Sequence, residues 1–241
     1  MNTASSVIFS IAIVLAAIFL GNAYVERTQT KGTISVTGLG SEDFTSDLIV
    51  WEGNFSREDL DLKQAYSDME QDKKLVDEYL SAKGIPEESV VFSAIRTFEN
   101  TRRDYVDGKY VGDVFEGYNL SRTVKIESTD VEKIETLSRE ITELLNQGLQ
   151  FYSNPPRYYY TKLSDLKIEM ISKATEDAHI RAQNIAENSG GTLGDLKSAR
   201  MGVFQITGQN SSEEQSWGGT FNTADKDKTA TITMRLQYEV D

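Results

Sequence analysis

The chain has no cysteine, one histidine and three prolines among its 241 residues. Without cysteine it can form neither disulfides nor thiolate metal sites, and it has no cysteine nucleophile. The single histidine, His179, excludes a metal site built from several histidines. Because proline is scarce and no Gly/Ser-rich linker occurs, we expect one compact unit rather than domains joined by hinges.

Positive charge is also in short supply, since 25 lysines and arginines face 38 acidic side chains, a formal net charge of −13. A surface of this sign repels phosphate backbones and anionic headgroups, so nucleic acid is not an expected partner. The first 25 residues carry no charged side chain at all. The leading segment therefore differs in kind from the rest of the chain.

That leading segment contains an apolar run, V-I-F-S-I-A-I-V-L-A-A-I-F-L, from Val7 to Leu20. The uncharged stretch from Ala4 to Ala23 would span about 30 Å as a helix, which matches the hydrocarbon core of a bilayer. We expect residues 1–23 to form a signal anchor or transmembrane helix that contacts inner-membrane lipid. A cleaved signal peptide is the alternative, because Gly21-Asn22-Ala23 places small residues at a cleavage site. A buried core helix is the weaker interpretation, since the run is apolar on all sides.

Four segments alternate between apolar and polar residues, at 33–39, 49–55, 118–126 and 229–240. This period of two predicts strands with one buried and one wet face, as in antiparallel sheets. The last segment is the most regular, and its apolar set is Ala230, Ile232, Met234, Leu236, Tyr238 and Val240.

Three further segments have helical periodicity, at about 62–80, 131–145 and 164–189. The third places a small residue every four positions, at Ala174, Ala178, Ala182 and Ala186. A stripe of small residues lets a helix lie close to its neighbour.

In chain order these segments predict β-β-α-β-β-α-β-α-β-β. The part from about residue 47 to 161 has the βαββαβ order of a ferredoxin-like unit. The predicted class is α+β, with largely antiparallel sheets, three main helices and the N-terminal apolar helix. We expect a spacer at residues 24–31 and a single domain at 32–241.

Several motifs resemble the SIMPL-domain family. Residues 32–40, G-T-I-S-V-T-G-L-G, are similar to its opening strand and glycine turn. Residues 174–194, A-T-E-D-A-H-I-R-A-Q-N-I-A-E-N-S-G-G-T-L-G, are similar to its alanine-rich helix and G-x-x-L-G turn. The resemblance covers roughly residues 32–240. It departs at Ser46-Asp47, where family members often have proline, and at 154–160.

The resemblance implies an exported bacterial protein without an established enzymatic activity. Bacterial members include periplasmic immunogenic proteins that assemble into ring-shaped oligomers, and some members are linked to oxidative-stress tolerance. It supplies no cofactor and no catalytic residue. We therefore expect a homo-oligomer in the cell envelope, with a periplasmic domain anchored to the inner membrane, or secreted to the periplasm if the signal is cleaved.

The residues themselves indicate no catalytic, cofactor or metal site. We interpret His179 as a partly exposed helical histidine rather than a base in a triad. Gly38-Leu39-Gly40 lacks the third glycine of a dinucleotide fingerprint, so we expect a turn between strands. Asp104 and Asp107 lack the spacing of a calcium loop, which favours a hairpin turn at Asp107-Gly108-Lys109.

Two surface segments are candidates for contact with a partner. Tyr158, Tyr159 and Tyr160 follow the double proline Pro155-Pro156. Alternate residues of a strand face opposite sides, so we expect at least one of these tyrosines to be exposed, and exposed aromatics are enriched at interfaces. Ordinary packing is the alternative interpretation.

The second candidate is the polar stretch from Gly208 to Lys228. A structureless connection of this length is unusual between strands, and such loops are often functional or disordered. Trp217, which precedes Gly218-Gly219, is the best single candidate for a partner-contacting side chain. A flexible loop with one tucked tryptophan is the alternative.

Two functions remain open from the sequence. The first is a non-enzymatic, membrane-tethered assembly or scaffold module that acts as a homo-oligomer, with an unknown protein partner. The second is an envelope small-molecule binder or carboxylate-dependent hydrolase, because the chain has ample carboxylates for such chemistry.

Overall fold

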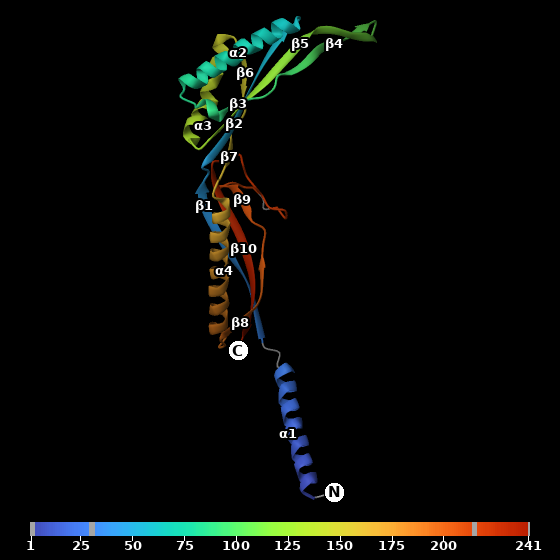
Figure 1. Cartoon of the computed structure of the whole chain (residues 1–241), viewed down its shortest axis with the longest axis vertical. Coiled ribbons are helices and arrows are strands. Elements are labelled where there is room, and N and C mark those ends of the chain that lie inside the picture. The colour runs from blue at the N-terminus through green and yellow to red at the C-terminus, as the bar shows by residue number, and fades with distance from the viewer. Residues whose placement is uncertain (1–2, 29–31, 214–215, 241) are drawn as a thin grey trace. The chain divides into compact units, whose positions relative to one another are not determined.

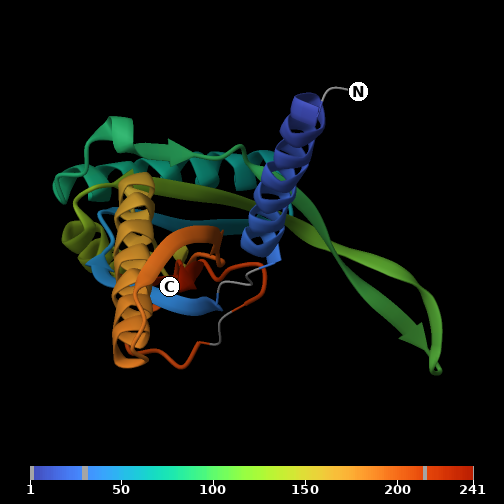
Figure 2. The same cartoon turned by 90° about the horizontal axis from the view of Figure 1, so that it is seen from below.

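The computed structural model describes the backbone of residues 3–28, 32–213 and 216–240 (Figures 1 and 2). Side chains are described for residues 9–24 and for the same ranges beyond residue 31. The chain groups into two compact units. The first unit contains residues 1–40, 169–203 and 232–241, and the second unit contains residues 41–168 and 204–231. Strands β1 (Gly32–Thr45) and β10 (Asp227–Val240) and helix α4 (Leu163–Asn188) contribute residues to both units.

Helix α1 (Thr3–Thr28) contains most of the uncharged leading segment. Every side chain from Phe9 to Tyr24 is exposed. In the part of the chain with described side chains, which includes residues 9–24 of α1, no helix is long and apolar enough to cross a membrane. Of the expected spacer, residues 24–28 belong to α1, whereas residues 29–31 lie outside the described residues.

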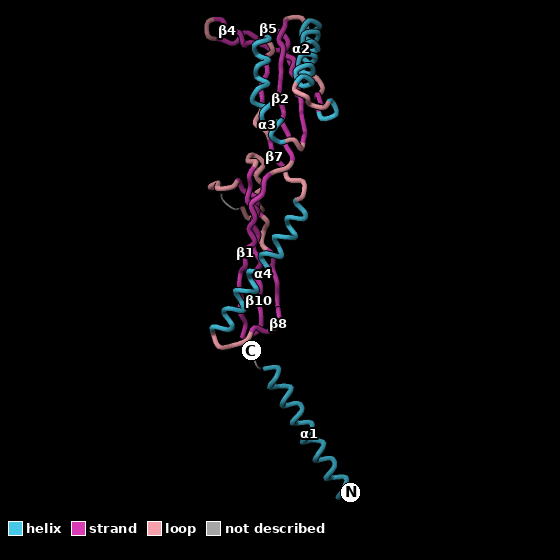
Figure 3. Tube along the Cα trace, turned by 90° about the vertical axis from the view of Figure 1, so that its left-hand side faces the viewer, coloured by secondary structure: helices cyan, strands magenta, loops and turns pink. Residues whose placement is uncertain are grey.

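The first unit contains strands in the order β1-β10-β8, with β8 at Leu193–Met201. Helix α4 lies along these strands (Figures 1 and 3). Strand β10 pairs with β8 in an antiparallel register that places Met234 opposite Met201. The predicted alternation of β10 is confirmed, because its residues from Ala230 to Tyr238 are buried at every second position.

The closest packing in the first unit joins α4 to β1. Gly38 and Gly40 of β1 face the buried alanine stripe of α4. A Cβ on Gly38 would lie 2.8 Å from the Cβ of Ala178 and closer still to the carbonyl oxygen of Ala174. The predicted turn at residues 38–40 is therefore wrong, since these residues lie inside β1, where their glycines make room for the helix.

A carboxylate of α4 accepts a hydrogen bond from β1 between these two glycines. The backbone N–H of Leu39 donates to Oδ2 of Asp177 at 2.8 Å, and Nε of Arg181 donates to its Oδ1 at 3.0 Å. These bonds, the one from Leu39 first, hold the pKa of Asp177 below its ordinary value. Because β1 is an edge strand, the bond gives a partner to an N–H that faces away from the sheet.

The second unit is built on an antiparallel sheet in the order β3-β5-β2-β6. Its strands are β2 (Leu48–Asp59), β3 (Val90–Phe92), β5 (Lys109–Ser128) and β6 (Gln150–Ser153). Helix α2 (Leu62–Ala82) follows β2, and α3 (Val131–Glu140) follows β5. This connectivity and strand order are those of the ferredoxin-like βαββαβ unit that the sequence predicts.

Further elements complete the unit. Strand β4 (Arg96–Val106) pairs with β5, β7 (Arg157–Tyr159) pairs with β2, and β9 (Gln205–Gly208) pairs with β10. Two 3-10 helices, η1 (Glu87–Ser89) and η2 (Ile141–Gln147), follow α2 and α3. The α+β class is confirmed, with more strands than predicted, because β3, β7 and β9 are too short to show alternation in the sequence.

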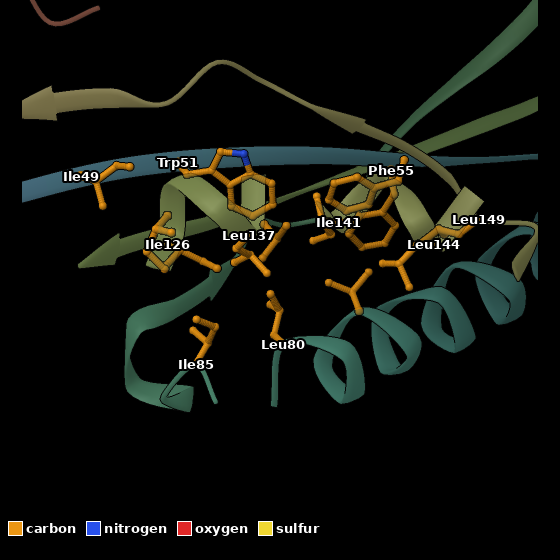
Figure 4. Packing of buried hydrophobic residues seen from close by; sticks show 14 of the residues in the cluster. Ile49, Trp51, Phe55, Leu80, Ile85, Ile126, Leu137, Ile141, Leu144 and Leu149 are labelled. Atoms are coloured by element: carbon orange, nitrogen blue, oxygen red, sulfur yellow. The ribbon is translucent and has the colours of Figure 1, made fainter. Parts of the chain in front are cut away.

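The core of the second unit lies between the sheet and its helices (Figure 4). Trp51 and Phe55 of β2 are fully buried, as their alternation predicts. Their rings lie 6.1 and 6.3 Å from the ring of Phe151 on β6. The indole N–H of Trp51 donates to Oγ of Ser153 at 3.0 Å, so the one polar atom of this large side chain has a partner.

We expect Gly38→Ala to lower the free energy of unfolding by about 3 kcal/mol or more, because the added methyl must displace the backbone of α4. Chemical denaturation of the full chain measures this loss. The matched control is Gly218→Ala, whose new Cβ would have Oγ of Ser216 at 4.0 Å as its nearest neighbour. Equal stability of the two variants would contradict this close packing of α4 on β1.

Candidate functional site

The sequence candidates for catalysis lie apart from any acid–base cluster. His179 is exposed on α4, and its Nδ1 lies 3.2 Å from the hydroxyl of Tyr238. Asp107 and Gly108 both have positive φ, and they form the predicted hairpin turn between β4 and β5. Among the residues with described side chains, no group of three His, Cys, Asp or Glu residues could hold a metal ion.

The three tyrosines after the double proline are packed against other residues rather than exposed to solvent. Tyr158 is buried and belongs to the hydrophobic core of the second unit. Tyr159 and Tyr160 are half-buried, and the ring of Tyr160 lies 4.8 Å from that of Phe44. None of the three is exposed, contrary to the expectation from alternation. A contact of Tyr159 or Tyr160 with a partner stays a prediction.

A cleft of about 470 Å³ opens beside these tyrosines. Strands β6 and β7 both pair with β2, and Asn154, Pro155 and Pro156 separate them. The prolines have no N–H to donate to β2, so the ladder is interrupted at this point. The lining consists of Val50, Glu52, Asn154, Pro155, Pro156, Arg157, Thr223 and Ala224.

The charges of the cleft are unpaired. Across the described ranges, neither the carboxylate of Glu52 nor the guanidinium of Arg157 has a hydrogen bond or ion pair with another side chain. Both groups line the same cleft, together with the apolar surface of Val50 and Pro156. The cleft thus offers one anionic and one cationic group to a small ligand, the usual way in which a few polar groups orient a molecule in a pocket.

The stretch from Gly208 to Lys228 is more ordered than the sequence indicates. Ile206 of β9 forms a parallel bridge with Phe221, so the stretch folds back along β9. The buried side chain of Asn222 accepts the N–H groups of Ala224 and Asp225 at 3.0 and 2.9 Å. The expectation of a structureless loop is therefore wrong for its described residues, which exclude 214 and 215. Its polar residues serve as hydrogen-bonding groups.

Trp217 lies exposed in a turn of this stretch. The side chain of Gln205 holds both sides of the turn, since its Nε2 donates to the carbonyl of Ser216 at 2.7 Å and its Oε1 accepts the N–H of Thr220 at 2.6 Å. The Gly219 N–H donates to the carbonyl of Ser216 at 3.1 Å, which closes the turn. The side chain of Trp217 is fully exposed, at 100%. Its role in partner contact stays a prediction.

A third exposed region was missed in the sequence. We call residues 96–116 of the β4–β5 hairpin the arm, which extends beyond the helices of the second unit (Figure 2). Seven large apolar side chains of the arm are exposed: Phe98, Tyr105, Val106, Tyr110, Val111, Val114 and Phe115. In the sequence, Asp107-Gly108 indicates the hairpin. No pattern in the sequence indicates that both faces of this hairpin would be exposed.

One buried cation lies next to the aromatic segment. Lys228 of β10 is 2% exposed, and its Nζ donates to the carbonyl oxygen of Tyr158 at 2.6 Å. Burial lowers the pKa of Lys228 to about 8, and the charge of Asp225 opposes this shift. Because the amine is enclosed, it ties β10 to β7 and is not placed to react with a ligand.

Comparison of the whole chain with curated proteins gives no match. A family model does match, that of the SIMPL family, described as a protein of unknown function (DUF541), over residues 34–240. The match covers most of the chain, so the chain belongs to the SIMPL family. The motifs at 32–40 and 174–194 therefore indicate the family correctly, even though the first of them forms no turn.

Lys228 makes stability depend on pH in a defined window. An unfolded lysine has a pKa near 10.5, so between about pH 8 and 10.5 the unfolded chain binds more protons, and stability rises with pH. From pH 7.5 to 9.5 we expect the unfolding free energy of the wild type to rise by about 2 kcal/mol more than that of Lys228→Met.

Urea denaturation at both pH values measures this difference. Lys226→Met is the matched control, because the charge of Glu135 raises the pKa of Lys226 and keeps it charged throughout the window. The control should keep the wild-type slope, and parallel curves for wild type and Lys228→Met would contradict the assignment.

Proposed function

We propose that this member of the SIMPL family is a non-enzymatic, membrane-tethered assembly or scaffold module of the bacterial cell envelope, and that it acts as a homo-oligomer. Its folded units then lie in the periplasm, held at the inner membrane by the N-terminal helix. A link to stress tolerance belongs to this proposal through the family resemblance alone.

The observation that carries the proposal is the apolar surface of the arm. Its seven exposed large apolar side chains occupy a ribbon of two strands, and neither face of that ribbon is covered in the single chain. A two-stranded hairpin is marginally stable in water, and exposed apolar patches mark interaction sites in soluble proteins. Contact with another protein surface would bury these side chains.

The character of α1 supports the tether. Its described side chains include Phe9, Ile11, Ile13, Val14, Leu15, Ile18, Phe19 and Leu20, all of them exposed. Exposed apolar area costs roughly 25 cal/mol per Å² relative to burial, so lipid is a favourable surrounding for these side chains. Counted over the sequence, and so including residues 4–8 whose side chains are not among those described, the uncharged run from Ala4 to Ala23 would measure about 30 Å as a helix.

The cleft favours a second candidate function, that of an envelope small-molecule binder. Its unpaired Glu52 and Arg157 match a ligand that carries both an ammonium and a carboxylate, such as an amino acid or a short peptide. A hydrolase of the glycosidase type uses two carboxylates, whereas Glu52 is the one carboxylate among the described lining residues. The geometry therefore favours binding over carboxylate-dependent hydrolysis.

The proposed function predicts a discrete oligomer. The full chain, extracted from membranes in mild detergent, should have a protein mass by light scattering that is a fixed multiple of 27.0 kDa. A strictly monomeric mass over a wide range of concentrations would contradict it. In the same preparation an N-terminus at Met1 supports the tether, whereas a chain that begins at Tyr24 would mean a cleaved signal.

The second candidate predicts a ligand-dependent rise in melting temperature. Free amino acids and dipeptides are the probes, and both Glu52→Gln and Arg157→Gln should abolish the shift because each removes one of the two charges. Arg200→Gln, an exposed position on β8, is the matched control and should keep it. No shift in the wild-type protein with any of these probes would retire this candidate.

A further inference from the structure

The arm has a free edge along its whole length. Strand β4 pairs with β5 and with no other strand of the described chain. The N–H and C=O groups on its other side therefore have no strand partner, and such an edge is a template for pairing with another chain. Both register shifts of the hairpin fall on β5, where Glu116 and Val111 are the extra residues, so β4 is continuous over its eleven residues.

Two opposite charges of β4 lie at equal distances from its centre. Thr101 is the middle residue of Arg96–Val106, with Glu99 two positions before it and Arg103 two positions after it. Alternate residues of a strand share a face, so these three side chains lie on one face of the arm. Within the described part of the chain, the side chains of Glu99 and Arg103 make no hydrogen bond or ion pair.

Arg102, by contrast, is already engaged within the arm. Its Nε lies 2.7 Å from Oε1 of Glu116, and its guanidinium lies 3.9 Å from Asp104. Arg102 is thus paired within the arm on the opposite face, whereas on the face of Thr101 neither Glu99 nor Arg103 forms an ion pair with a described residue, although Asp113 of β5 lies across from Arg103. Glu99 and Arg103 are therefore available to a partner.

We propose that the arm binds the arm of a second copy of this chain, with β4 antiparallel to β4 about a two-fold axis at Thr101. The inference rests on the proposed homo-oligomer and names its contact and register. In this register all eleven residues of β4 are paired, and Glu99 of each copy lies opposite Arg103 of the other. The two hairpins become one four-stranded sheet, which is large enough for independent stability.

Competing registers are less favourable. With a two-fold axis perpendicular to the sheet, one residue must lie opposite its own copy, because paired residues share a face. Centring the axis on Glu99, Arg102 or Arg103 places like charges directly opposite each other, which is destabilising. Centring it on Asn100 avoids this conflict but pairs nine residues and leaves Glu99 opposite Thr101.

The same register places aromatic side chains beside the new pairs. Phe115 and Tyr110 of β5 lie opposite Thr101 and Tyr105 of β4, so they occupy the face of Glu99 and Arg103. The rings of Tyr105 and Tyr110 lie 5.9 Å apart and approach edge to face. In the paired sheet, Tyr105 would lie opposite the partner's Thr97, and this would remove part of the exposed ring from water.

Because the chain has no cysteine, an introduced cysteine can form a disulfide between chains only with another introduced cysteine. In the full chain, Thr101→Cys should form a disulfide-linked dimer with oxidised glutathione, because directly opposed Cα atoms lie about 4.5 to 5.5 Å apart, within disulfide range. Thr97→Cys is the matched control, since it is exposed on the same face of the same strand. Its copies would lie about 27 Å apart and should stay unlinked. Co-expressed Thr97→Cys and Tyr105→Cys chains should cross-link to each other.

Charge reversal tests the pairing without a covalent bond. Glu99→Arg and Arg103→Glu should each weaken association of the full chain about tenfold or more, because each creates two like-charge pairs. The double variant restores both pairs and should return to within about threefold of the wild type. Sedimentation at several concentrations measures this, and Lys109→Glu at the end of the hairpin is the control for a simple change in net charge.

The outcomes separate this inference from the proposed function. An oligomer in which Thr101→Cys stays unlinked, or in which Thr97→Cys links as readily, overturns the arm pairing and leaves the assembly function standing. A double charge variant as weak as the single ones overturns the register. A monomeric wild-type chain overturns both.

Discussion

The direct contact of helix α4 with strand β1 is the constraint on which the first unit depends. Gly38 and Gly40 remove side chains from the strand, and the stripe that includes Ala174 and Ala178 removes bulk from the helix, so that backbone meets backbone. This proximity brings the carboxylate of Asp177 within hydrogen-bond distance of the Leu39 N–H. The same small residues therefore allow the helix to pack closely and bring Asp177 near enough to bond the N–H of Leu39 on the open edge of the sheet.

In the second unit, the candidate functional surfaces lie where the regular sheet ends. Pro155 and Pro156 interrupt the ladder between β6 and β7 and open the cleft. Strands β4 and β5 continue past the core and become the arm, whose faces are exposed. The turn with Trp217 extends from β9 on side-chain bonds to Gln205. The core built on Trp51 and Phe55 is the rigid part of the unit. The segments that leave the regular sheet form its candidate binding surfaces.

Much of this architecture could be predicted from residue patterns, because burial and periodicity are coupled. The alternation of β2 and β10 and the alanine stripe of α4 each correspond to one buried face. The glycines at 38 and 40 suggest a turn although they lie inside β1, because a sequence does not distinguish a glycine needed for its dihedral angles from one needed for space. The exposure of the arm could not be predicted, because a hairpin motif such as Asp107-Gly108 does not indicate whether other segments cover the faces of the hairpin. The sequence places Asn222 in a structureless stretch, whereas its side-chain amide accepts two backbone N–H groups that fix that segment.

The two tryptophans of the chain occupy opposite extremes, since Trp51 is fully buried and Trp217 fully exposed. An indole in an apolar core emits at shorter wavelength than one in water, and a small solute can quench only the latter. The protein therefore contains two independent optical reporters. Emission from Trp51 follows the integrity of the core, while the quenching of Trp217 follows whatever approaches the surface. Association and unfolding can thus be observed separately in the unlabelled chain.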